Sequence, residues 1–167
     1  VVTTMSDDRG RTTVADLTRE LGVRVYPVGR LDYDSEGLLL MTNDGELANM
    51  IMHPSGGITK TYRTWVTGDI APALEALRVN ITIDGVSVRA KSVEPAKISE
   101  TRGVLLITIG EGRNREVRKM CAACGLRVTR LMRIKEGPLE LGGVMPGTYR
   151  HLTAHEVASL SRAAGMK

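Results

Sequence analysis

The sequence predicts an α+β fold built on a mostly antiparallel sheet. Two patterns support this: expected strands outnumber expected helices, and several neighbouring strands are joined by short turns. The chain has 167 residues, of which 42% are hydrophobic, enough for the core of one domain. With no phenylalanine, one tryptophan and four tyrosines, that core must be mainly aliphatic. We find no repeat, low-complexity tract or linker, so a single unit is expected.

The first part of the chain predicts two helices and a strand between them. These are a helix at 14–21 ended by Gly22, a buried strand at 38–42, and a helix at 46–52. Asn43-Asp44-Gly45 forms a turn whose side chains can cap the second helix, and His53-Pro54 ends it.

The second part alternates strands with helices. Its expected elements are strands at 62–67, 81–83, 86–88, 104–109 and 128–134, and helices at 72–77, at 115–124 and after Thr153. Asp84-Gly85 supplies the positive-φ turn that a two-residue hairpin prefers. Thr153 and Glu156 match a capping box, with Val157 and Leu160 expected inside.

The sequence lacks the signals of export and of disulfide bonding. No apolar run approaches the ~18 residues of a membrane span. The N-terminal VVTTMSDDRG is unlike a signal peptide. Cys121 and Cys124 are too close in sequence for a disulfide between them to cross-link distant parts of the chain. We therefore expect a protein with reduced cysteines in the cytoplasm.

Positive charge is concentrated in one segment. The net charge is +4, but residues 111–135 contain eight basic and two acidic residues, which gives +6 there and leaves −2 elsewhere. Such a segment on a near-neutral body is typical of proteins that bind a polyanion such as nucleic acid. The alternative is an ordinary solvated helix face.

Familiar cofactor motifs are absent. Cys121-Ala-Ala-Cys124 is half of a zinc site without a second cysteine pair, and two cysteines on a buried helix face explain it better. Gly110-Glu-Gly-Arg113 lacks the Lys-Ser/Thr ending of a phosphate loop. These motifs therefore support neither a structural zinc site nor a nucleotide cofactor.

A charged loop precedes the expected buried strand. Residues 29–37, GRLDYDSEG, hold one arginine, two aspartates and a glutamate between glycines. Asp32 can be a simple turn residue, since aspartate favours turns. The number of polar residues instead indicates a loop that presents a carboxylate in a cleft. A partly desolvated carboxylate needs a positive partner to stay ionised, and the basic helix at 115–119 can supply it.

Four blocks, in order, resemble one family. They are GRLDYDSEGLLL at 29–40, TNDGELA at 42–48 followed by His53-Pro54, Lys60-Thr61-Tyr62, and EGRNREVRKM at 111–120. Together they resemble the RNA pseudouridine synthases of the RsuA/RluB type, from the N-terminus to about Glu156. The resemblance implies a bent, mostly antiparallel sheet flanked by helices, and no cofactor.

The resemblance also implies roles for single residues. Asp32 is the expected catalytic carboxylate, Tyr62 lies against the target uracil and helps remove the proton at carbon 5, and Arg118 pairs with Asp32. The remaining cations expected to contact RNA are Arg30, Lys60, Arg113, Arg115, Lys119, Arg130 and Arg133. The carboxylate could add to the uracil ring or the anomeric carbon, or abstract a ribose proton. The target base must leave its stack, and phosphate contacts can offset the free-energy cost of this unstacking.

The resemblance sets the expected biology. We expect residues 1–167 to be a catalytic domain truncated at its N-terminus, because relatives carry a small RNA-binding domain and a lysine-proline segment before it. The expected substrate is ribosomal RNA, free or in a pre-ribosomal particle. The sequence of residues 113–118 resembles RluB more closely and favours the large-subunit 23S RNA. A monomer is expected. The alternatives are a non-catalytic RNA-binding module of the same fold and a protein-interaction domain.

Overall fold

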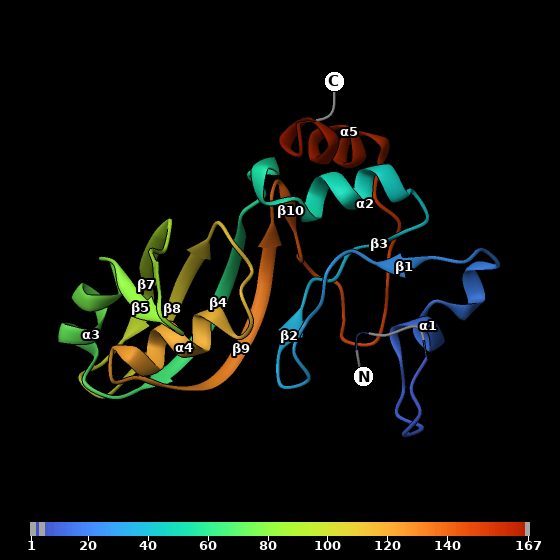
Figure 1. Cartoon of the computed structure of the whole chain (residues 1–167). Coiled ribbons are helices and arrows are strands. Elements are labelled where there is room, and N and C mark those ends of the chain that lie inside the picture. The colour runs from blue at the N-terminus through green and yellow to red at the C-terminus, as the bar shows by residue number, and fades with distance from the viewer. Residues whose placement is uncertain (1–2, 4–5, 166–167) are drawn as a thin grey trace. The chain divides into compact units, whose positions relative to one another are not determined.

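The computed structural model describes residue 3 and residues 6–165; the other residues of VVTTMSDDRG lie outside the described part. The chain forms two compact units (Figure 1). The first contains the residues up to Ile58 and those from Glu136 onward; the second is Thr59–Lys135. No linker in the sequence marks this division, because the first unit is assembled from two separated stretches.

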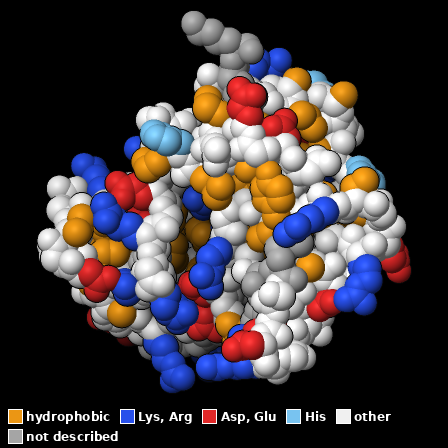
Figure 2. Space-filling view, turned by 45° about the vertical axis from the view of Figure 1, so that its right-hand side comes forward, with side chains coloured by type: hydrophobic (Ala, Val, Ile, Leu, Met, Phe, Trp, Pro, Cys, Tyr) orange, Lys and Arg blue, Asp and Glu red, His pale blue; other side chains and the backbone are white. Residues whose placement is uncertain are grey.

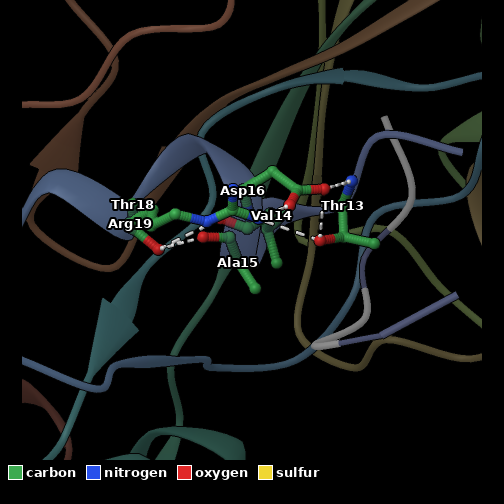
Figure 3. Close-up of polar contacts among 6 residues, drawn as sticks. All are labelled: Thr13, Val14, Ala15, Asp16, Thr18 and Arg19. Carbon is green, nitrogen blue, oxygen red and sulfur yellow. Dashed lines mark hydrogen bonds and ion pairs between the residues drawn. The ribbon is translucent and has the colours of Figure 1, made fainter.

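The first unit begins with a short helix capped at both ends. Helix α1 is Val14–Leu17, and a 3₁₀ helix at Arg19–Leu21 follows it and ends at Gly22. Thr13 caps α1 by accepting from the backbone of Asp16, whose carboxylate accepts from Thr13 in return (Figure 3). The predicted continuous helix at 14–21 is therefore interrupted at Thr18, whose hydroxyl donates to carbonyl oxygens of the preceding turn.

Short strands frame the charged loop of this unit. Strand β1 (Tyr26–Pro27) pairs antiparallel with β3 (Met41–Thr42), and β2 is Glu36–Gly37. The predicted strand at 38–42 is thus shorter than expected. Of its apolar run only Leu40 is fully buried, while its neighbours are half-buried.

Two helices build the core of the first unit. Helix α2 is Gly45–Met52, with Asp44 as its N-cap, as predicted; strand β10 is Leu139–Glu140; and helix α5 is Ala154–Ala163, with the predicted capping box at Thr153. Leu47, Ile51 and Leu160 pack in a cluster with Val28, Leu40 and Leu139. The prediction that Val157 lies inside is wrong: it is 39% exposed, whereas Leu160, three residues on, is 1% exposed.

The second unit is an antiparallel sheet with two helices. Its strands are ordered β9-β4-β8-β7, with β4 at Lys60–Thr67, β7 at Ser92–Ile98, β8 at Arg102–Ile109 and β9 at Arg127–Glu136. Strand β7, which the sequence reading missed, is interrupted by a bulge between Pro95 and Lys97. A proline and a run of exposed side chains hide it from pattern analysis.

Both helices of this unit pack on the same face of the sheet. Helices α3 (Ile70–Leu77) and α4 (Glu116–Ala123) bury side chains such as Leu77 and Met120 in one cluster with Leu105 and Ile107 of β8. The predicted hairpin is present as β5 (Ile81–Ile83) and β6 (Val86–Val88), with positive φ at both turn residues. The observed mixture of helices with mostly antiparallel sheet confirms the α+β prediction.

Candidate functional site

Asp32 lies at the start of a tight turn in the first unit. The backbone N–H of Ser35 donates to the carbonyl oxygen of Asp32 at 2.9 Å, which places Tyr33 and Asp34 at the exposed corner. The Asp32 side chain is half-buried, whereas Tyr33 is 73% exposed. Asp32 can therefore be both a turn residue and a functional carboxylate, because it is less exposed than Tyr33 and Asp34 at the corner of the turn.

The base of this turn is fixed on both sides. Val28, 2% exposed, donates its N–H to the carbonyl oxygen of Leu40 at 2.8 Å. The hydroxyl of Thr3 donates to the Leu31 carbonyl oxygen at 3.0 Å and accepts from the Leu31 N–H at 3.3 Å. Ordered backbone on either side of a reactive group reduces the freedom lost when substrate binds. No sequence signal pointed to Thr3, because the contact joins segments 28 residues apart.

Tyr62 and Lys60 lie on β4 in the second unit. Tyr62 is opposite Ile107 of β8 and is half-buried against the core of this unit, so its ring is held on the face that the helices cover. Lys60 begins the strand, opposite Ile109. Its ammonium nitrogen lies only 3.0 Å from where a side chain on Gly112 would start, so Gly112 leaves room for it. The structure thus brings Lys60 to the loop that contains Arg113.

That loop leads into α4 through a strained residue. Arg115 precedes the helix with φ of 52°, a left-handed conformation that is uncommon for arginine. Arg113 and Glu116 lock the entry: the Arg113 N–H donates to the Glu116 carboxylate at 2.9 Å, and the Glu116 N–H donates to the Arg113 carbonyl oxygen. Arg118 and Lys119 follow on the first turns of the helix, both half-buried.

Glu116 is a buried carboxylate that sequence reasoning overlooked. It is 5% exposed, and this burial raises its pKa. The hydrogen bond from the Arg113 N–H and the positive charges of Arg113 and Lys60 lower the pKa and offset part of that rise. The contact of Glu116 with the Arg113 backbone is not a capping box, because Arg115 is the residue that precedes α4, so no sequence signal marked Glu116. We interpret Glu116 as the residue that shapes the cationic loop.

The predicted cations are not equally available to a ligand. Arg113 and Arg115 are exposed, although Arg113 forms an ion pair with Glu111 at 2.7 Å. Lys119 forms an ion pair with Asp84 of the hairpin. Arg133 is 2% exposed, so the structure does not support a phosphate contact through its side chain.

The basic segment does not form one continuous patch. The Arg130 guanidinium lies over the ring of Trp65 at 4.6 Å, on the sheet face opposite the one that α4 covers. On the face shown in Figure 2, lysine and arginine side chains alternate with acidic ones. The tertiary structure therefore divides a charge run that looks continuous in the sequence.

The predicted catalytic residues are distributed over both units. Asp32 belongs to the first unit, as does the predicted RNA-contact residue Arg30, whereas Tyr62 and Arg118 belong to the second. Arg30 is exposed, beside Gly29, which has φ of 80°. The meeting of the three catalytic side chains in one site stays a prediction.

The described residues contain neither a group of metal ligands nor a membrane-spanning helix. Within residues 3 and 6–165, no three His, Cys, Asp or Glu side chains are grouped so that they could hold a metal ion. No helix in the same residues is long and apolar enough to cross a membrane.

Comparison with known proteins identifies the family. The family model described as RNA pseudouridylate synthase matches residues 1–123, and the chain belongs to this family. The Bacillus subtilis (strain 168) protein named "Ribosomal large subunit pseudouridine synthase B" is 42% identical over 98% of this chain. An Aquifex aeolicus (strain VF5) protein named "Uncharacterized RNA pseudouridine synthase" is 39% identical over 95% of it. The chain spans 68% and 64% of these relatives' own lengths, about two thirds.

Solved structures agree on the fold. A crystal structure of a pseudouridylate synthase matches with a TM-score of 0.72 and 31% identity, covering 84% of this chain and 61% of that one. A chain of an archaeal box H/ACA complex, 17% identical with a TM-score of 0.60, covers 76% of this chain and 43% of that one, and shows the fold alone. The predicted family and fold are confirmed.

Proposed function

We propose that this chain isomerises a uridine to pseudouridine in ribosomal RNA, with Asp32 as the catalytic carboxylate. The observation that carries the proposal is the family match over residues 1–123, which includes the turn that presents Asp32. The preference for large-subunit RNA is supported by the name of the Bacillus relative. We place the reaction in the cytoplasm, on free ribosomal RNA or a pre-ribosomal particle, with the chain acting as a monomer.

The reaction rearranges bonds without adding or removing atoms. The bond between N1 of uracil and C1′ of ribose breaks, the base turns, a bond forms between C5 and C1′, and the proton leaves C5 as N1 gains one. A carboxylate suits this chemistry because it can act as nucleophile or base and is regenerated at the end. In this proposal Asp32 starts the rearrangement, Tyr62 stacks on the base and assists at C5, and Arg118 keeps Asp32 ionised and oriented.

The phosphate contacts near the target uridine are proposed for the exposed Arg30, Arg113 and Arg115 and for the half-buried Lys60. Lys60, Arg113 and Arg115 lie near the entry of α4, and Arg30 lies two residues before Asp32. Contacts of this kind would repay the few kcal/mol needed to extrude the target base. Arg133 is left out of the proposed contact set because of its burial.

The decisive experiment compares two aspartates of one turn. Asp32→Asn and Asp34→Asn each remove one negative charge, but only Asp32 has the proposed role. Each variant is incubated with ribosomal RNA lacking the modification, and pseudouridine is mapped chemically. We expect no detectable product with Asp32→Asn and near-wild-type product with the exposed control Asp34→Asn. Equal modification by the wild-type chain and Asp32→Asn would overturn the proposal and favour the non-catalytic RNA-binding module.

The roles of the other two residues are separable by kinetics. Tyr62→Phe keeps a ring for stacking but loses the hydroxyl, so we expect a slower chemical step with little change in RNA affinity. Arg118→Lys keeps the positive charge but loses the planar, bidentate guanidinium, so its activity should be lower than that of the wild type. Single-turnover rates and RNA dissociation constants measured on both variants test these roles.

A further inference from the structure

The sheet of the second unit has a face that its helices leave uncovered. On this face Trp65 lies opposite Val104, and Arg63 lies opposite Leu106, because directly paired residues of β4 and β8 point to the same side. None of these four side chains belongs to the core cluster that α3 and α4 complete, and each is half-buried or exposed. We call this surface the Trp65 face.

An arginine from the neighbouring strand is already stacked on this face. The Arg130 guanidinium lies over the Trp65 ring, 4.6 Å from its centroid, and Thr129 beside it donates its hydroxyl to the Trp65 carbonyl oxygen. Arg130 is exposed, whereas Trp65 is half-buried. Arginine planes and aromatic rings are the groups on which unpaired RNA bases stack.

The charges around the stack favour a polyanion. Arg63 and Arg102 are exposed on the same face, since Arg102 pairs with Thr67, two residues beyond Trp65. Lys97, opposite Val104, adds a further cation. The acidic residue in the register of this face is Glu94, opposite Leu106. On β4, β7 and β8 the paired residues of this face thus include three cations and one carboxylate, and Arg130 of β9 adds a fourth cation.

We propose that the Trp65 face is a second RNA-binding surface, which takes a single-stranded segment by stacking one base on the Arg130–Trp65 pair and holding the adjacent phosphates with Arg63 and Arg102. It is distinct from the contacts proposed at α4, because that helix packs on the opposite face of the sheet. The choice of RNA rests on the proposed function. The surplus of cations on this face complements a polyanion.

The chain provides its own local probe for the test. Trp65 is its one tryptophan, so intrinsic fluorescence reports on this face. A single-stranded RNA of about 12 nucleotides is titrated into the wild-type chain, Arg130→Gln and the control Arg89→Gln; a site of this kind covers roughly 4–16 nucleotides. Arg89 is exposed in the same unit, beyond the β5–β6 hairpin, so its variant loses the same charge elsewhere.

We expect RNA to change the Trp65 fluorescence of the wild-type chain. In Arg130→Gln the dissociation constant measured from this signal should rise by about tenfold. The slope of log affinity against log salt concentration should also fall, by the equivalent of about one phosphate contact. Arg89→Gln should match the wild type. Trp65→Leu, followed by anisotropy of labelled RNA, should weaken binding to a similar degree. Circular dichroism melts confirm that each variant is folded.

The outcomes separate this inference from the proposed function. Pseudouridine formation should be lost in Asp32→Asn and unchanged in the control Arg89→Gln, which belongs to neither proposed set of RNA contacts. If Asp32→Asn loses activity but RNA still changes its Trp65 fluorescence as in the wild type, the result supports the second RNA-binding surface. A Trp65 signal that RNA does not change, or equal affinities for Arg130→Gln and the wild type, would refute it. A signal that instead depends on protein concentration, with a dimer in sedimentation, would assign the face to a second copy and also refute it.

Discussion

Two neighbouring leucines of β8 provide a direct test of how the second unit is built. Leu105 is 0% exposed in the core beneath α3 and α4, whereas Leu106 is half-buried on the Trp65 face. Substitution of either by alanine removes the same three carbon atoms from the same strand. Only the first substitution leaves a cavity in a packed core, because solvent can fill the space at the second.

The structure sets the size of the expected difference. The removed carbons are worth about 0.8 kcal/mol each in transfer free energy, or about 2.4 kcal/mol, when they are fully buried. A cavity term raises the cost of Leu105→Ala to about 3–5 kcal/mol. For the half-buried Leu106 we expect about 1 kcal/mol, from partial burial alone.

Urea denaturation followed by Trp65 fluorescence measures both costs within the second unit, where the chain's one tryptophan lies. With a slope of about 2 kcal/mol per molar urea, Leu105→Ala should lower the midpoint by about 1.5 M or more, and Leu106→Ala by about 0.5 M. Equal shifts, or a larger shift for Leu106→Ala, would show that the assignment of strand faces is wrong. The inference about the Trp65 face would then fail with it.

Three further predictions concern other parts of the chain. Gly68→Ala should destabilise by about 1–3 kcal/mol in urea denaturation, since φ is +139° and the new carbon would lie 2.8 Å from a backbone carbonyl oxygen; a neutral result would contradict this. Burial raises the pKa of Cys121 to about 12, so a thiol reagent should label Cys124 in the folded chain and reach Cys121 only on unfolding; rapid labelling of both would be inconsistent with the fold. The hydrogen-bonded guanidinium of Arg150 lowers the pKa of Glu156 from 4.5 to about 2, so this pair stabilises the folded state above about pH 4.5 and less as pH falls toward 2. Arg150→Gln should therefore flatten the loss of stability over that pH range, and an unchanged acid profile would exclude this contribution.

Local signals in the sequence predicted elements whose cause is local. The Asp84-Gly85 hairpin, the capping box at Thr153 and the helix capped by Asp44 are all present, because each depends on side-chain and backbone chemistry within a few residues. Elements that depend on distant partners were less predictable. Strand β7 exists because β8 pairs with it, despite its proline and bulge.

By itself the sequence determined the class of protein. The motifs at 29–40 and 111–120 identified the family, and strand alternation together with turn and cap residues determined the α+β class, because these features are properties of short segments. Only the tertiary structure decided which cations share a surface. It placed Arg130 on Trp65, buried Arg133 and tied Thr3 to the turn of Asp32, because burial and contact depend on which distant strands and loops meet.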